Sequence, residues 1–512
     1  MFIEGKVVKG RYFDSVFLMK MARTVSEFEG VQDSSVVVGS AENIKILKSA
    51  ELFLESFSEA TGNDLIIVLK GVDGQILNEA LLKALELMNP KENLSGKKNN
   101  EQTQSLESAL TKLPKANLAL FSIAGKYVAE EAMNALKQNL HVMLFSDNVS
   151  LEDEIKLKTY GRDKGLFVMG PDCGTAIIDG VPLAFANAVH RGPIGVVAAS
   201  GTGLQEVTCL ISNLGEGISQ AIGTGGRDIK KEVGGICFLM GVEALMNDPE
   251  TKVILLVSKP PHEDVMNKIT QKVKGTTKPV IALFLGATKE SLKETGIHYA
   301  ENLADAAFLA VKHCNKINHS PFFDLEELKK VAGSILTRAK KGQYLRALYS
   351  GGTFCYETQL ILNKLGVGEV FSNAPTAHSF KLENNFQSIR HTVLDLGEDE
   401  FTVGRPHPMI DFSLRNKRII EEAKNPETMI LLLDLVLGYG AHLNPLADLL
   451  PTLKEALQYV PIIVSVTGTD QDPQGRREIM KTLRETGIVV KESNAQAATL
   501  AGLALKLKGG AV

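Results

Sequence analysis

The chain has 512 residues, of which 44% are hydrophobic and 23% are charged, and its formal net charge at pH 7 is −4. Because this length is more than one hydrophobic core fills, we expect three or four domains. The near-balanced charge, the 6% aromatic content and the lack of tryptophan offer nucleic acid neither a general attraction nor a stacking surface, so we expect no nucleic-acid partner.

Membrane and disulfide-rich classes are also disfavoured. The chain contains no run of 18 apolar residues and its N-terminus has no secretory hydrophobic segment, so we expect a cytoplasmic protein without a membrane span. The five cysteines form no Cys-x-x-Cys pair. We therefore expect reduced core thiols and no metal site.

Apolar strands alternate with amphipathic helices along the chain, and the strands are continuous runs of Val, Ile and Leu. This pattern is typical of parallel α/β sheets that are buried on both faces. Residues 1–90 are predicted to form an N-terminal α/β domain of unknown role. Its expected elements are strands near Lys6–Phe13, Ser34–Gly39 and Asp64–Lys70 and a helix at Ser15–Phe28. Residues 91–113, rich in Lys, Asn, Glu, Gln and Ser, are predicted to be a linker.

The rest of the chain is predicted to contain three more domains. They are residues 114–191, residues 192–320 and residues 346–512, with a helical linker at 321–345. Strands are expected at Leu118–Ile123, His141–Phe145, Gly165–Met169, Gln220–Ile222, Val253–Ser258, Pro279–Leu285, Arg346–Ser350, Met429–Leu435, Ile462–Val466 and Ile488–Val490.

The most informative segment is Gly192–Val207, which joins a buried strand, a glycine turn and the start of a helix. Ser200 can cap that helix, and Gly201 and Gly203 leave backbone N–H groups free to approach an oxyanion. With Thr202, these residues are predicted to bind phosphate. The alternative is a purely structural turn of a doubly wound sheet.

A second glycine turn follows the apolar strand Met429–Leu437. Its residues are Gly438, Tyr439, Gly440, Ala441 and His442, and Pro445 is placed to begin the next helix. If the two domains face each other, the two helix N-termini would bind one phosphoryl group from opposite sides. The alternative is two unrelated structural turns.

Several motifs together resemble a known family. The segments 167–175, 194–203, 221–229, 247–253 and 278–280 follow in order the pattern of the α subunit of succinyl-CoA synthetase. His391–Leu505 resembles the ligase domain of that enzyme's β subunit, while no segment resembles its ATP-grasp domain. This combination is similar to the FdrA family of bacterial acyl-CoA synthetase-like proteins. The resemblance implies a Rossmann-like CoA-binding-type domain at 114–191 and flavodoxin-like ligase domains at 192–320 and 346–512.

The departures from that family concern the phosphoryl carrier. In the synthetases a histidine in a Gly-His-Ala-Gly loop carries the phosphoryl group and a glutamate supports it. Here Ala282–Thr288 leads through a short helix to Gly296–Asp305, so we expect the loop to be absent and His298 to be a surface or packing residue. Lys259 stands where the glutamate is expected, and it would neutralise a free or carbamoyl phosphate. The alternative is a solvated lysine at a strand end.

Membership of the FdrA family implies a subunit of oxamate carbamoyltransferase, which exchanges oxalurate and phosphate for oxamate and carbamoyl phosphate in allantoin and purine breakdown. The catalytic candidates are then Lys259, His442 and Arg227. Arg227 would hold a substrate carboxylate with two hydrogen bonds, and the alternative is that it is a surface charge on a loop. Phosphate or carbamoyl phosphate is the implied ligand, and other subunits in a hetero-oligomer, or a second copy in a homodimer, are the implied partners.

CoA binding and two other functions stay open. The family's Gly-rich turn is missing at Lys9–Ser15, whereas the later CoA-domain elements Ser122–Lys126 and Gly170–Gly174 persist, so no cofactor is certain. One alternative is an NDP-forming acid–CoA ligase that uses a separate ATP-grasp chain, with His442 as its nominated phosphoryl carrier. The other is a non-catalytic scaffold subunit.

Overall fold

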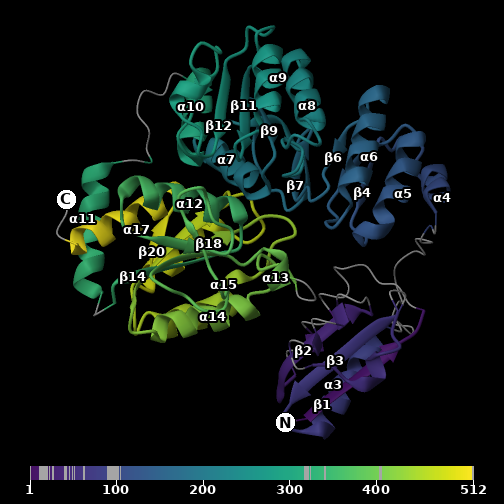
Figure 1. The fold of residues 1–512 in the computed structure, drawn as a ribbon, viewed down its shortest axis with the longest axis vertical. Coiled ribbons are helices and arrows are strands. Elements are labelled where there is room, and N and C mark those ends of the chain that lie inside the picture. The colour runs from purple at the N-terminus through teal and green to yellow at the C-terminus, as the bar shows by residue number, and fades with distance from the viewer. Residues whose placement is uncertain are drawn as a thin grey trace. The chain divides into compact units, whose positions relative to one another are not determined.

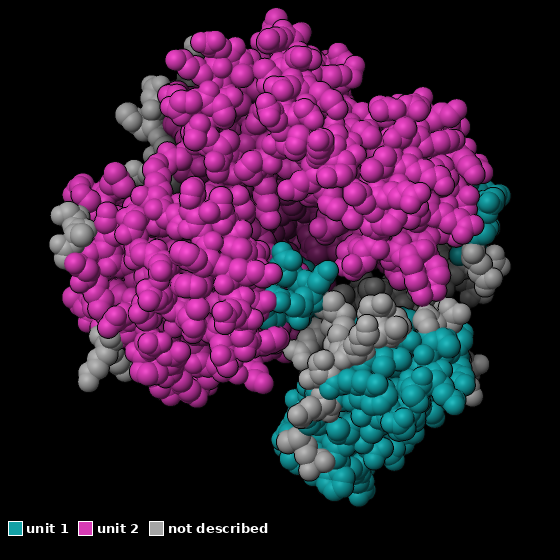
Figure 2. Space-filling view, in the orientation of Figure 1, with its two compact units in different colours: residues 1–116, 398–407 teal, residues 117–397, 408–512 magenta. Residues whose placement is uncertain are grey.

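The computed structural model describes residues 2–10, 28–39, 52–61, 64–88, 105–315, 324–339, 342–402 and 406–509, together with single residues and pairs between 21 and 50 and residues 103 and 322. The chain divides into two compact units. One comprises residues 1–116 and 398–407, and the other residues 117–397 and 408–512 (Figure 2). No helix in the described ranges has both the length and the apolarity that a bilayer crossing requires.

The first unit contains a three-stranded sheet in the order β1-β3-β2. Its described elements are β1 (Phe2–Val8), β2 (Val31–Val38), the 3-10 turn η1 (Glu55–Phe57), β3 (Leu65–Gly71), α3 (Gly74–Leu87), α4 (Leu106–Lys112) and the short α13 (Asp399–Thr402). Both outer strands pair antiparallel with β3, so the expectation of parallel pairing is wrong for this domain. Only the central strand is a continuous buried run, whereas β1 is partly exposed along its length. The continuous apolar run of β3 therefore reflects its central position in the sheet and does not indicate parallel pairing.

Part of the predicted N-terminal structure lies outside the described residues. This holds for residues 11–13 of the first expected strand, for most of the expected helix 15–28 and for most of the linker 91–113. Within the linker the structure nonetheless forms α4, because Ser105 and Ser108 cap its first turn reciprocally.

The second unit begins with a small parallel sheet in the order β4-β5-β6. Its elements are β4 (Leu118–Phe121), α5 (Gly125–Lys137), β5 (His141–Leu144), α6 (Leu151–Lys164) and β6 (Val168–Met169). The alternation of strand and helix agrees with the predicted Rossmann-like architecture.

A seven-stranded sheet follows, in the order β13-β12-β11-β9-β10-β7-β8. Its elements are β7 (Thr175–Ile178), β8 (Val181–Ala184), β9 (Arg191–Ala198), α7 (Gly201–Asn213), β10 (Ile218–Gly223), α8 (Ile236–Asn247), β11 (Val253–Ser258), α9 (Glu263–Val273), β12 (Val280–Phe284), η2 (Lys289–Leu292), β13 (His298–Tyr299) and α10 (Leu303–Asn315). In chain order β9 to β13 are arranged 5-4-3-1-2, which is the flavodoxin-like order and confirms that part of the prediction. The hairpin β7–β8 extends this sheet back to residue 175, before the boundary predicted at 192.

The last sheet has the order β16-β15-β17-β14-β18-β19-β20, and its described pairings are parallel. Its elements are α11 (Leu325–Arg338), β14 (Tyr344–Tyr349), α12 (Gly352–Leu365), β15 (Val370–Ser372), β16 (Phe380–Lys381), β17 (His391–Asp395), α14 (Ser413–Lys424), β18 (Thr428–Val436), α15 (Pro445–Ala456), β19 (Ile462–Thr467), α16 (Arg476–Glu485), β20 (Val489–Lys491) and α17 (Asn494–Lys508). The strands β17-β14-β18-β19-β20 repeat the flavodoxin-like order, and β15 and β16 extend the edge beside β17.

Helix α7 joins these two sheets. It packs with α10 in its own domain and with α12 and β19 of the last domain (Figure 1). Every residue from Thr202 to Ser212 is consequently buried. A helix that is buried on all sides has no solvated face, so its polar side chains need partners inside the protein.

Two buried glutamates supply such partners across the domain boundary. Glu206 of α7 accepts hydrogen bonds from the Asn494 backbone N–H at 2.9 Å and from the Thr467 hydroxyl at 3.0 Å. Glu357 of α12 accepts from the Leu303 N–H at 2.7 Å and from the Asn494 side-chain amide at 2.8 Å. The two carboxylates thereby hold the first turns of α10 and α17 and tie the two flavodoxin-like domains together.

Burial shifts the titration of both groups. It raises the pKa of Glu357 from an ordinary 4.5 to about 7, although the two donors oppose the shift. Burial and the neighbouring Glu357 also raise the pKa of Glu206. The folded protein therefore keeps protons that the unfolded chain releases between about pH 4.5 and 7, and this contribution to stability is lost as the pH rises through that window.

We predict that the stability of Glu357→Gln relative to wild type increases as the pH rises from 5 to 8, because the amide never pays the cost of a buried charge. The amide nitrogen replaces an oxygen that accepts a hydrogen bond, and this cost does not change with pH. The measurement is urea unfolding of both proteins at four pH values. Glu326→Gln, at an exposed carboxylate of α11, is the matched control and should show a constant difference. A difference between Glu357→Gln and wild type that does not change with pH would contradict the assignment.

Candidate active site

The first turns of α7 and α12 meet where β9 and β14 end. Ser200 caps α7 by accepting a hydrogen bond from the Gly203 N–H at 3.0 Å. Its hydroxyl oxygen also lies 2.6 Å from the hydroxyl oxygen of Thr353 in the first turn of α12. Two helix N-termini, each at the carboxyl end of a central parallel strand, thus share one junction. Ligands of open α/β sheets bind at such positions.

Small residues make this close approach possible. A Cβ atom on Gly351 would lie 2.6 Å from Cγ2 of Thr202, and one on Gly352 would lie 2.4 Å from Oδ2 of Asp395. The other oxygen of Asp395 accepts a hydrogen bond from the Gly397 N–H at 2.9 Å, which fixes this carboxylate beside the start of α12. A side chain at Gly351 would force the two helix starts apart, and one at Gly352 would displace the Asp395 carboxylate.

The turn before α12 is anchored from beneath by a buried ion pair. Both the N–H and the hydroxyl of Ser350 donate to Asp434, at 3.0 and 2.7 Å. Arg415 pairs with the same carboxylate at 2.7 Å, and both charged side chains are almost completely buried. This network fixes the backbone that positions Thr353.

Two buried hydroxyls near this junction have no hydrogen-bond partner among the described residues. They are Oγ1 of Thr175, at the start of β7, and Oγ of Ser258, at the end of β11. Thr175 Oγ1 lies 4.0 Å from the position that a Cβ atom would take on Gly201. Buried polar atoms normally have partners, so unused donors at the carboxyl edge of a sheet are expected at a ligand site.

Lys259 follows β11 and reaches across the domain boundary. Its Nζ atom lies 5.2 Å from the centre of the Tyr356 ring in the first turns of α12. The structure therefore places the half-buried lysine beside the first turns of α12. A cation beside the start of α12, where two helix N-termini meet, favours a bound anion, and a phosphate or phosphoryl group matches this arrangement chemically.

The second predicted turn, residues 438–441, does not supply the opposing helix. Tyr439 donates its backbone N–H to the Ala186 carbonyl at 2.9 Å, and a Cβ on Gly440 would lie 3.0 Å from the Phe185 ring. These glycines allow the turn to pack on the segment after β8. The partner of Ser200 is instead the Ser-Gly-Gly-Thr turn at 350–353, which follows a predicted strand and carries the same signal as the first turn.

His442 is held in a structural role. Its Nδ1 accepts the Asn444 N–H at 3.0 Å, its Nε2 lies 2.7 Å from an Asp448 carboxylate oxygen, and its ring stacks on Phe412 with centroids 4.9 Å apart. Both ring nitrogens are therefore engaged at the start of α15. These contacts argue against the nominated role of phosphoryl carrier.

Arg227 also makes structural contacts. Its Nε lies 2.8 Å from a carboxylate oxygen of the buried Glu154 in α6, and its Nη2 donates to the Val149 carbonyl at 2.8 Å. The fully buried Lys158 pairs with Glu154 and with Asp228, at 2.8 and 2.7 Å. Arg227 thus belongs to a charge network that joins the Rossmann-like domain to the loop after β10. Arg227 is therefore not an isolated surface charge. Its Nε and Nη2 atoms already have partners, so they do not offer a paired site for a substrate carboxylate.

The shortened loop after β12 appears as expected. The chain passes from β12 through η2 directly to β13, with no room for a carrier loop. His298 is exposed, and its ring lies 4.4 Å from that of His313, which agrees with a surface or packing role.

We predict that Gly201→Val weakens phosphate binding at the first turn of α7 while leaving the fold intact. The new side chain has space, since the nearest atom is 4.0 Å from its Cβ, and its methyl groups would occupy the place of the anion. Calorimetric titration with inorganic phosphate should show a loss of roughly tenfold or more in affinity, equivalent to at least about 1.4 kcal/mol. Gly333→Val, at an open position of α11, is the control. Unchanged phosphate affinity would remove the α7 turn from the site.

Three family models match the chain. A "CoA binding domain" model matches residues 190–286, a "CoA-ligase" model matches residues 348–504, and an "AllF, heavy metal-associated domain" model matches residues 1–105. The first match includes β9 and α7, and the second begins at the end of β14 and includes α12. The CoA-binding match lies on the first flavodoxin-like sheet, whereas the CoA-binding-type domain was predicted at 114–191.

A heavy-metal site built on cysteine or histidine does not fit the segment that the third model matches. Residues 1–105 contain neither residue, and these are the usual ligands of such ions. The described residues also contain no group of three potential ligands of the His, Cys, Asp or Glu type.

The relatives are of two kinds. Protein YahF of Escherichia coli (strain K12) is 39% identical over 499 residues, which is 96% of each chain. The α subunit of succinate–CoA ligase from Methanothermobacter thermautotrophicus is 24% identical over 35% of this chain and 61% of its own length. The α subunit of malate–CoA ligase from Methylorubrum extorquens is 27% identical over 35% and 62%. Among solved structures, an acetyl-CoA synthetase of Ca. Korarchaeum cryptofilum aligns with 77% of this chain at 15% identity, with a TM-score of 0.33.

Proposed function

The chain belongs to the FdrA-like family of acyl-CoA synthetase-like proteins, together with YahF, and from this premise we propose that it transfers an acyl-type group to or from phosphate between the first turns of α7 and α12. The observation that carries the proposal is the 2.6 Å contact between the Ser200 and Thr353 hydroxyls. It brings two helix N-termini, Lys259 and two unpartnered hydroxyls to one junction.

The contacts of His442 and the short connection after β12 support direct transfer over a phosphohistidine intermediate. The connection leaves no room for the family's carrier loop, and both ring nitrogens of His442 are engaged at the start of α15. A phosphate site that works without a carrier is suited to orienting two substrates and stabilising the departing charge.

The specific reaction that we propose is carbamoyl transfer between carbamoyl phosphate and oxamate, with this chain as one subunit of the enzyme. The oxamate nitrogen forms a bond to the carbamoyl carbon, and the bond from that carbon to the phosphate oxygen breaks. Phosphate leaves with the electron pair and takes up the proton that the nitrogen loses. The helix N-termini and Lys259 would stabilise the charge that develops on the phosphate.

The relatives favour a second candidate, an acid–CoA ligase that forms a nucleoside diphosphate and works with a separate ATP-grasp chain. Two of them are named as α subunits of CoA ligases. This function requires a phosphoryl carrier, which the other chain would have to provide. A non-catalytic scaffold is the third possibility, and the unused hydroxyls at the junction weigh against it.

We predict that the protein, assayed alone and with proteins encoded beside it, releases phosphate from carbamoyl phosphate only when oxamate is present. Parallel reactions receive ATP, CoA and succinate.

Lys259→Glu should lower kcat/KM for carbamoyl phosphate by roughly tenfold or more, since it reverses a charge beside the phosphate. Lys274→Glu, an exposed lysine after α9, is the matched control and should have little effect.

The other outcomes are equally informative. ATP consumption that depends on CoA, with no response to oxamate, would contradict carbamoyl transfer and support the ligase. A chain that binds neither phosphate, carbamoyl phosphate nor CoA would support the scaffold.

A further inference from the structure

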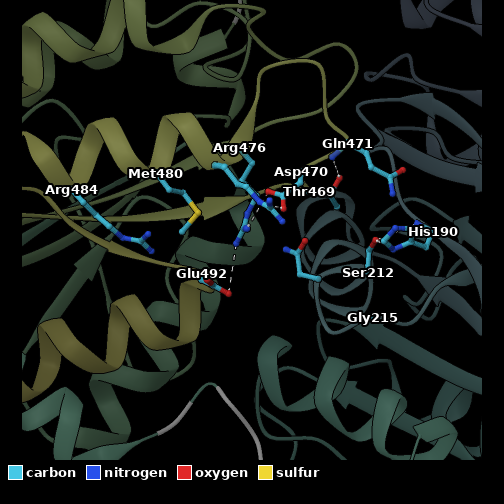
Figure 3. Close-up of a pocket in the computed structure, with 12 residues that line it drawn as sticks. His190, Ser212, Gly215, Thr469, Asp470, Gln471, Arg476, Met480, Arg484 and Glu492 are labelled. Atoms are coloured by element: carbon cyan, nitrogen blue, oxygen red, sulfur yellow. Dashed lines mark hydrogen bonds and ion pairs between the residues drawn. The ribbon is translucent and has the colours of Figure 1, made fainter.

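A separate cavity of about 620 Å³ lies at the other end of α7. Its walls come from the C-terminal end of α7, from the loop after β19, from one face of α16 and from the residue after β20 (Figure 3). A helix of 13 residues is roughly 20 Å long, so the cavity is well separated from Ser200. On the side of the last sheet it opens at the carboxyl ends of β19 and β20, a position where open α/β sheets bind ligands.

The central feature of this cavity is Arg476, the first residue of α16. Its side chain is only 8% exposed. The nearest carboxylates are 3.9 Å away, from Nη1 to Asp470, and 3.7 Å away, from Nη2 to Glu492, so neither forms a hydrogen bond. Its Nε and Nη2 atoms are buried and have no hydrogen-bond partner in the described part of the chain.

The two unused donors are adjacent on the guanidinium group. Nε–H and one Nη2–H point in parallel along one edge of the group, the arrangement that binds both oxygens of a carboxylate or phosphate. A buried cation with unsatisfied donors is costly, and a bound anion would remove that cost. Figure 3 shows Arg476 at the centre of the lining residues.

The surrounding residues define the ligand further. Arg476 and Arg484 are two turns apart on α16 and line the same wall, so the cavity has a second cation at its far end. Arg477 pairs with Asp470 at 2.5 Å, whereas Asp470 stays 3.9 Å from Arg476 and forms no hydrogen bond with it. The lining includes no Phe, Tyr or Trp, which disfavours a stacked nucleobase.

We propose that this cavity binds a small, non-aromatic organic anion through a carboxylate or phosphate group held by Nε and Nη2 of Arg476. Its volume is in the range of known small-molecule sites. The ligand touches both flavodoxin-like domains, because His190 and Ser212 line the wall opposite α16. The proposal does not depend on the chemistry at Ser200.

The test uses the full chain with the Gly201→Val substitution, so that the Ser200 site is removed. Inorganic phosphate, succinate and ADP are titrated separately by calorimetry at constant ionic strength. We expect one saturable site for phosphate or succinate, and the stronger of the two identifies the group that the ligand carries. Stronger binding of ADP than of both would overturn the assignment to a non-aromatic ligand.

Variants of α16 link the binding to Arg476. Arg476→Lys keeps the charge but loses the paired donors, and it should weaken binding at least tenfold. Arg484→Gln should weaken binding severalfold. Because Arg484 is exposed, this variant is expected to fold normally, so its loss of binding does not reflect a folding defect. Lys481→Gln, on the same helix but outside the cavity, should stay within twofold of the parent.

A thermal unfolding measurement separates ligand binding from a structural role. Without added anion, Arg476→Gln should unfold no earlier than the parent, and its midpoint should not rise with the anion as the parent's does. No saturable binding of phosphate or succinate, or equal binding by the parent and Arg476→Lys, would overturn the proposal.

Discussion

The contact between the first turns of α7 and α12 is the constraint on which the rest of the structure depends. Each helix N-terminus carries a partial positive charge, so two that face each other repel unless an anion or fixed acceptors lie between them. The protein holds them together from behind. Glu206 and Glu357 bridge the domains through Asn494 and Leu303, and the Asp434–Arg415 pair fixes the turn before α12. The front of the junction has the unpartnered hydroxyls and Lys259, a set of donors that suits an anion.

This arrangement accounts for the features that depart from the CoA ligases. A mobile phosphohistidine needs a loop and a supporting acid, whereas here the loop is short and a lysine follows β11. His442 and Arg227 are instead used to fix helix starts and domain contacts. The chain keeps the CoA-ligase domains, whereas the described residues after β12 form a short connection in place of the loop that carries the phosphohistidine.

Local patterns predicted the fold well where strand and helix signals were continuous. The flavodoxin-like domains, the cap at Ser200 and the short connection after β12 all follow from apolar runs and turn residues. Pairing direction in the N-terminal sheet could not be predicted, because a central strand looks the same in either direction. Equally, the sequence marks glycine turns but not which of them face each other. Ser350–Thr353 and Gly438–Ala441 carry similar signals, and only tertiary packing places the first beside Ser200.

The most direct test is a crystal structure of the full chain, from crystals grown in a sulfate-free buffer that contains inorganic phosphate. We expect tetrahedral density between the two helix starts, within hydrogen-bonding distance of the Gly201 or Thr202 N–H and of a hydroxyl from Ser200 or Thr353. Continuous contact of the two hydroxyls with no anion at saturating phosphate, or phosphate bound only beside Gly438–Ala441, would contradict this expectation.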